Sequence, residues 1–176
     1  MKLVNLFLFA NVKFCSFADA FLETIIMKKI CLLFFAIALC FSSYGQYVDL
    51  GLPSGTLWKS ANEKGFYGFE EAVVKFGNNL PEKWQWTELL NSCSWTWTGA
   101  GFNIVGPNGK SIFLPPLGKR ECEGFMDDED SGYYWSATVS SNAPNYSWVF
   151  LFDEGGGDWD DYDWCDRCSI RLVQNR

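Results

Sequence analysis

The sequence predicts an α+β domain, and three observations lead to this prediction. Two helical patterns occur early, between residues 69 and 91. Strand patterns with alternating side chains follow them, as far as residue 173. All nine tryptophans lie between Trp58 and Trp164, which indicates one aromatic-rich core. Helices followed by a run of antiparallel strands are typical of this fold class.

The first part of the chain has the pattern of an export signal. Met27-Lys28-Lys29 is followed by an apolar run from Ile30 to Phe41 and then by small residues up to Gly45. This order is typical of a secretory signal peptide, and the run is shorter than the roughly 20 apolar residues of a membrane-spanning helix. We therefore expect residues 27–45 to be a signal peptide. Residues 1–26 are expected to be an upstream extension of the reading frame, with a second, longer leader as the alternative.

Residues 46–176 are expected to form a single exported domain that is secreted, periplasmic or at the outer-membrane surface. Cys40 suggests a lipid anchor, but Leu39 before it is too bulky for the cleavage that such an anchor requires. The domain holds 10 Lys and Arg against 19 Asp and Glu, a net charge of 10 − 19 = −9. This charge repels phosphate backbones and anionic lipids, so we expect neither nucleic acid nor a membrane as its partner.

The elements follow from local patterns in chain order. Residues 47–52 and 56–60 are expected to be extended, on either side of the turn Pro53-Ser54-Gly55. A helix is predicted from Phe69 to Phe76, with Val73 on its apolar face and Gly77 as its end. A second helix is predicted from Pro81 to about Asn91, because proline suits the first helical turn. Its buried stripe is Trp86, Leu89 and Leu90.

After the second helix the pattern has a period of two. Trp95 and Trp97 alternate with threonines, as in a half-buried strand. The turn Gly106-Pro107-Asn108-Gly109 between two apolar runs predicts a hairpin. The predicted strands are residues 102–105, 111–114, 133–139, 146–152 and 169–173. The acidic residues between the last two are expected to be a loop with a flexible glycine tip at 155–157.

Four cysteines remain after the predicted cleavage: Cys93, Cys122, Cys165 and Cys168. An even number in an exported domain indicates disulfides, and four cysteines allow three connectivities. We favour a bond from Cys122 to either Cys165 or Cys168. Cys165 and Cys168 have the CxxC spacing of redox and zinc sites. Acidic neighbours raise the pKa of a thiol, which argues against redox chemistry, and the lack of other soft ligands argues against zinc.

The acidic stretch near the C-terminus holds the candidate site residues. Asp158, Asp160, Asp161 and Asp163 offer the oxygen ligands of a weak calcium site. A solvated acidic loop is the simpler interpretation, because the glycine and final glutamate of an EF-hand are missing. Trp159, Tyr162 and Trp164 alternate with these acids and are candidates for stacking against a sugar or a peptide. The alternative for these aromatic side chains is packing over the edge of the sheet.

The order of motifs resembles a known family. The motifs are Val48–Trp58, Leu80-Pro81 with Trp86–Leu89, Cys93–Thr98, Asn108–Pro115, Gly132–Thr138 and Ser169–Val173. Together they are similar to the Fibrobacter succinogenes major paralogous domain (FISUMP-like domain) of exported Bacteroidetes proteins. This resemblance implies a C-type-lectin-like fold, related to formylglycine-generating enzymes, with two short helices and a curled antiparallel sheet. It implies no defined activity.

Two departures limit what the wider kinship implies. Calcium-dependent C-type lectins hold calcium with a Glu-Pro-Asn or Gln-Pro-Asp triplet, whereas this chain has Ala143-Pro144-Asn145. The copper-binding cysteines of formylglycine-generating enzymes are spaced more widely than Cys165 and Cys168. We therefore expect neither calcium-dependent sugar binding at that triplet nor oxidase activity.

The sequence supports three hypotheses about function. The chain has no histidine, the commonest general base and metal ligand, so we expect no enzyme and no cofactor. The first hypothesis is a non-catalytic binding or surface-adhesion module for a glycan or protein at the cell surface, with the loop aromatics as contacts. The second is an enzyme of the formylglycine-generating type or a small hydrolase, and the third a structural surface protein without a small ligand. Among the nine tryptophans, the sequence leaves the role of Trp84 ambiguous.

Overall fold

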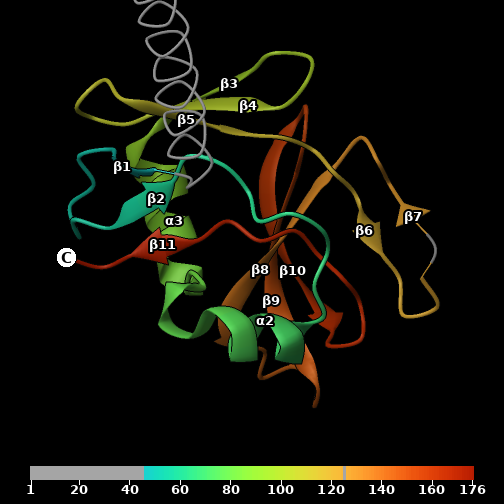
Figure 1. Ribbon diagram of the computed structural model, residues 1–176. Coiled ribbons are helices and arrows are strands. Elements are labelled where there is room, and N and C mark those ends of the chain that lie inside the picture. Colours follow the sequence, from blue (N-terminus) through green and yellow to red (C-terminus); the bar gives the residue numbers. More distant parts are fainter. Residues whose placement is uncertain (1–45, 125) are drawn as a thin grey trace, which may run out of the picture. The chain divides into compact units, whose positions relative to one another are not determined.

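Figure 1 shows the computed structural model of the protein, in which residues 46–124 and 126–176 are described. The expected upstream extension and signal peptide, with Cys40, lie outside these residues. The described residues belong to one compact unit. None of their helices has the length and apolar character needed to cross a membrane.

The structure confirms the α+β class. The described residues form two helices, α2 (Phe69–Phe76) and α3 (Lys83–Ser92), which are joined through the 3-10 turn η1 (Gly77–Asn79). The strands are β1 (Tyr47–Asp49), β2 (Leu57–Lys59), β3 (Ser94–Trp97), β4 (Phe102–Val105), β5 (Ser111–Leu114), β6 (Lys119–Arg120), β7 (Met126–Asp127), β8 (Gly132–Val139), β9 (Tyr146–Asp153), β10 (Gly156–Asp163) and β11 (Val173–Gln174).

The described strands form four small antiparallel sheets, in the orders β1-β2-β11, β3-β4-β5, β10-β9-β8 and β6-β7. The first sheet brings the two ends of the domain together, because β11 pairs with β2 (Figure 1). The β4–β5 hairpin has the predicted strands, and its turn places Gly109 at a φ of 81°, which suits glycine. Alternation in β3 is also confirmed, since its two tryptophans are half-buried and its serine and threonine are exposed.

The β8–β9–β10 sheet is covered on both faces. Phe150 and Phe152 of β9 belong to a first core with Trp86 of α3, whereas Val149 belongs to a second core with Phe69 of α2. Successive side chains of a strand point to opposite faces, so one strand supplies both cores. Each of these buried side chains stabilises the fold by roughly 1.5–3 kcal/mol. The sheet is therefore an internal layer and presents little open surface for a ligand.

Each helix covers one of these cores. In α3, Trp86 and Leu89 are buried as predicted, whereas Leu90 is half-buried against the first core. The helix begins at Lys83, because Glu82 is the N-cap and Pro81 lies before it. In α2 the bounds are as predicted, yet Val73 is 41 % exposed. The buried residues of this helix are Phe69 and Ala72, a stripe that leaves Val73 outside the core.

The prediction that the acidic residues form a loop is wrong, because residues 156–163 form the strand β10. All eight residues of β10 pair with β9 in unbroken register, from Gly156 opposite Asp153 to Asp163 opposite Tyr146. The two-residue turn Glu154-Gly155 joins the strands, and Gly156 has a φ of 134°. Backbone pairing with the long β9 outweighs the low strand preference of aspartate.

The strand predicted at residues 169–173 is also wrong in extent, since only Val173 and Gln174 form β11. The residues before it make backbone hydrogen bonds to separate segments instead of to one strand. Ser169 O accepts from Trp135 N, Ile170 O from Glu63 N, and Leu172 O from Lys59 N. This segment therefore connects elements rather than extending one sheet.

A buried arginine holds this connecting segment in place. Arg171 is 1 % exposed, and its guanidinium donates to Asn62 Oδ1 (2.7 Å), Lys59 O (2.8 Å) and Phe113 O (2.6 Å). These acceptors belong to β2, the segment after it and β5. Burial lowers the pKa of Arg171 from its usual value, and the nearby Tyr134 opposes this shift. One side chain thus joins the first sheet to the β3–β5 sheet.

Replacement of Arg171 should be among the most damaging single changes. Arg171→Met removes three hydrogen bonds from a charged, buried donor to part-buried oxygens, so we expect the free energy of unfolding to fall by at least about 3 kcal/mol. Arg176→Met is the matched control, because that side chain is 60 % exposed and its ion pair with Asp49 lies at the surface, where solvent screening leaves such pairs little net stabilisation. Urea denaturation followed by fluorescence measures both. Equal losses for the two variants would contradict the role given to Arg171.

Candidate ligand-binding site

The three aromatic side chains expected to contact a ligand are packed against the cores. Trp159 is half-buried and packs against the first core, with its ring centroid 5.6 Å from that of Phe150. Tyr162 points to the opposite face of β10, where its ring meets that of Tyr133 at 5.7 Å.

Trp164, just after β10, is also engaged. Its ring stacks on Phe69 at 5.2 Å, and its indole N–H donates to Ser147 Oγ at 2.8 Å. Strand alternation separates Trp159 from Tyr162, so Trp159, Tyr162 and Trp164 do not share one contact surface. Packing explains their positions.

The four aspartates proposed as calcium ligands are not brought together. Asp158 and Asp160 lie on one face of β10, and Asp161 and Asp163 on the other. Asp161 accepts a hydrogen bond from Ser140 Oγ, and Asp163 accepts one from the backbone N–H of Cys165. Among the described residues, the one group with metal-ligand geometry is Cys122, Cys165 and Asp166.

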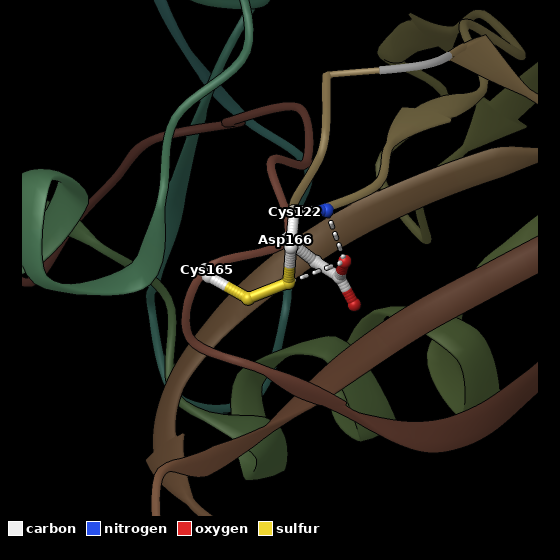
Figure 2. A group of neighbouring side chains, drawn as sticks. All are labelled: Cys122, Cys165 and Asp166. Carbon is white, nitrogen blue, oxygen red and sulfur yellow. Dashed lines mark hydrogen bonds between the residues drawn. A yellow bond between two sulfur atoms is a disulfide. The ribbon is translucent and has the colours of Figure 1, made fainter.

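Two of that group are joined by a disulfide, which Figure 2 shows. Cys122 is bonded to Cys165 with a Cα–Cα distance of 4.9 Å, so the expected pairing of Cys122 is confirmed with Cys165 rather than Cys168. Asp166 accepts from the backbone N–H of Cys122 at 3.1 Å (Figure 2). The bond ties the segment between β6 and β7 to the turn after β10, and it occupies the sulfurs that a metal would need.

The two free cysteines of residues 46–176 are poor nucleophiles at neutral pH. Burial, with a smaller contribution from the Glu88 carboxylate, raises the pKa of Cys93 to about 11. Burial also raises the pKa of Cys168 well above its usual value. Both groups are therefore thiols rather than thiolates near pH 7, and only the thiolate reacts or binds metal. The CxxC pair combines one disulfide-bonded cysteine with one buried thiol.

An open hollow between the two helices offers better geometry for binding. Its volume is about 420 Å³, and its lining residues are Val73, Gly77, Asn78, Leu80, Glu82, Trp84, Gln85, Ala137 and Asn175. Trp84 is 53 % exposed, whereas the other eight tryptophans, all within the described residues, are buried or half-buried. An exposed tryptophan beside polar side chains is a usual contact surface for sugars and peptides.

Helix geometry explains why Trp84 is exposed. Residues two apart on a helix point to nearly opposite sides, so burial of Trp86 directs Trp84 outward. The sequence contained this signal as a tryptophan that lies off the apolar stripe of its own helix. Val73 of α2, which is also exposed, contributes to the lining of the same hollow.

Three polar residues of the hollow, Glu82, Gln85 and Asn175, are held by hydrogen bonds. Gln85 Oε1 accepts from the backbone N–H of Glu82 at 2.9 Å, which is half of a capping box at the start of α3. Gln85 Nε2 donates to Asn175 Oδ1 at 2.8 Å, and the Glu82 carboxylate accepts from the Thr138 hydroxyl. Because Asn175 uses its oxygen for this contact, its NH₂ group is left for a ligand.

Two other hollows have less suitable linings. One of about 500 Å³ lies beside β1, and two of its charged lining residues, Asp49 and Arg176, form an ion pair with each other. Another of about 400 Å³ lies at the β9–β10 turn. Cys93 and Trp95 line it, and both side chains are half-buried against the first core. Neither contains an exposed aromatic ring, so the hollow between α2 and α3 is the strongest candidate.

The thiol pKa values predict a clear order of alkylation. Iodoacetamide should label Cys93 slowly at pH 8, where roughly 0.1 % is thiolate, and about tenfold faster for each pH unit towards pH 11. Cys168 should react only after unfolding, because its thiol is completely buried. Peptide mass spectrometry identifies the labelled sites, and Cys93→Ser should remove native labelling from the peptides of residues 46–176. Rapid native labelling of Cys168 would show that the C-terminal segment is open.

Comparisons with protein-family models, curated proteins and solved structures found no match to this chain. The candidate site therefore depends on the geometry of the described residues. Its features are the exposed ring of Trp84, the amides at its rim and the fixed carboxylate of Glu82.

Proposed function

We propose that the protein is an exported, non-catalytic binding or surface-adhesion module that contacts a glycan or a peptide at the hollow between α2 and α3. The observation that carries this proposal is Trp84, whose half-exposed ring lies at a hollow with polar side chains. The volume of about 420 Å³ falls within the range of small-molecule sites, about 300–1,000 Å³. Trp84 therefore replaces the aromatics of β10 as the contact residue.

The chemistry of the hollow favours binding over catalysis. Glycoside hydrolysis requires two carboxylates across a cleft, and Glu82 is the one carboxylate in the lining. That group is already bound to the start of α3 and to Thr138. An enzyme of the formylglycine-generating type needs reactive cysteines, and here the free thiols have raised pKa values.

Export and family membership are part of the same proposal. The disulfide Cys122–Cys165 supports an oxidising compartment, since such bonds persist outside the reducing cytosol. We also propose a FISUMP-like domain with a C-type-lectin-like arrangement, with two short helices and small antiparallel sheets as its support. The order of motifs along the chain supports the same assignment.

Substitution of Trp84 tests the proposed site. Trp84→Ala should weaken every specific hit on a mixed glycan and peptide array at least about tenfold, as expected when a central aromatic contact is removed. Phe113→Ala is the matched control, because Phe113 is a 40 % exposed aromatic on β5, away from the hollow. The array is read with and without calcium, and both readings should agree.

Two outcomes would contradict the proposal. Hits that survive Trp84→Ala would place the contact site elsewhere. An array without any specific hit would favour a structural surface protein that has no small ligand.

A further inference from the structure

The walls of the hollow suit a flat ring with one apolar face. Trp84 supplies an exposed aromatic surface, and Val73 and Ala137 supply small apolar contacts. A pyranose ring presents C–H groups on its faces and hydroxyls around its edge. In a binding site, aromatic side chains pack against the C–H groups, and polar side chains at the rim form hydrogen bonds with the hydroxyls.

The polar side chains at the rim match the hydroxyls of a sugar. Asn175 has its oxygen bound to Gln85 and its NH₂ group available as a donor. Asn78 is exposed and makes no side-chain hydrogen bond within the described part of the chain. Sugar hydroxyls both donate and accept, so these amides and the Glu82 carboxylate complement them.

The charge of the hollow favours a neutral ligand. Glu82 is its only charged lining residue, and no lysine or arginine lines it. A helix N-terminus otherwise attracts anions, but that of α3 is already capped by Glu82. The net charge of −9 over residues 46–176 adds to the repulsion of acidic sugars and acidic peptides.

The sheet edge beside the hollow is not open to a peptide strand. Peptides often bind by adding a strand to an exposed edge, and β8 is the edge strand here. However, the backbone N–H of Ala137 donates to Pro81 O at 2.8 Å, and that of Trp135 donates to Ser169 O at 3.2 Å. Strand addition at this edge would break contacts that hold the fold, which favours a glycan over an extended peptide.

We propose that the hollow between α2 and α3 binds one pyranose ring of a neutral glycan, without calcium. Trp84 packs against the C–H face of the ring. The Asn78 and Asn175 amides and the Glu82 carboxylate bind its hydroxyls. This inference rests on the proposed binding function and adds the ligand class.

The test uses the full chain expressed with its own N-terminal segment, on an array of neutral glycans, acidic glycans and peptides. Neutral glycans should bind, and the methyl glycoside of the matching sugar should displace them. Asn175→Asp keeps the acceptor for Gln85 and removes the NH₂ donor, so binding should weaken about tenfold. Asn91→Asp is the matched control, because it adds the same charge at an exposed position at the other end of α3 and should change nothing.

The outcomes separate this inference from the proposed function. Peptide or acidic-glycan hits that depend on Trp84 would overturn the glycan inference and leave the binding site intact. Hits that are indifferent to Trp84, or no hit at all, would overturn both. Equal losses from Asn175→Asp and Asn91→Asp would show a general charge effect and would contradict the role of the Asn175 amide.

Discussion

The fold depends on a sheet that is buried on both of its faces. Strand β9 sends Phe150 and Phe152 into one core and Val149 into the other, so α3 and the β3–β5 sheet cover one face and α2 covers the other. Strand β10 follows the same alternation, with Trp159 on one side and Tyr162 on the other. This constraint assigns the aromatic side chains of β10 to packing and leaves the outer sides of the two helices for contact with a ligand.

The C-terminal segment links these layers without forming a long strand. Its carbonyl oxygens accept hydrogen bonds from three segments, and Arg171 donates to three more oxygens in its buried surroundings. Burying a guanidinium carries a large desolvation cost. Here its hydrogen bonds to uncharged oxygens offset that cost. The disulfide between Cys122 and Cys165 adds a covalent link nearby, and closing a loop of this length contributes about 4 kcal/mol in the chain-entropy account.

The sequence predicted the elements whose signals are local. The bounds of α2 and the β4–β5 hairpin followed from apolar periodicity, Gly77 and the Asn-Gly turn. Strand β10 could not be predicted this way, because it forms through pairing with β9 and its aspartates oppose the local preference. The candidate site was missed for a related reason. Trp84 lies on the outer side of α3, but the hollow beside it exists only once α2, η1 and the C-terminus come together.

The aromatic side chains of β10 pack against the cores, whereas Trp84 faces solvent. Hydroxyl-radical footprinting with peptide mass spectrometry measures the accessibility of each tryptophan in the folded protein. Trp84 should be oxidised fastest of the nine, with Trp159 and Trp164 slower and Trp58, Trp86 and Trp135 nearly inert. Oxidation of Trp159 and Trp164 at the rate of Trp84 would contradict the packing of β10 and return the candidate site to the acidic strand.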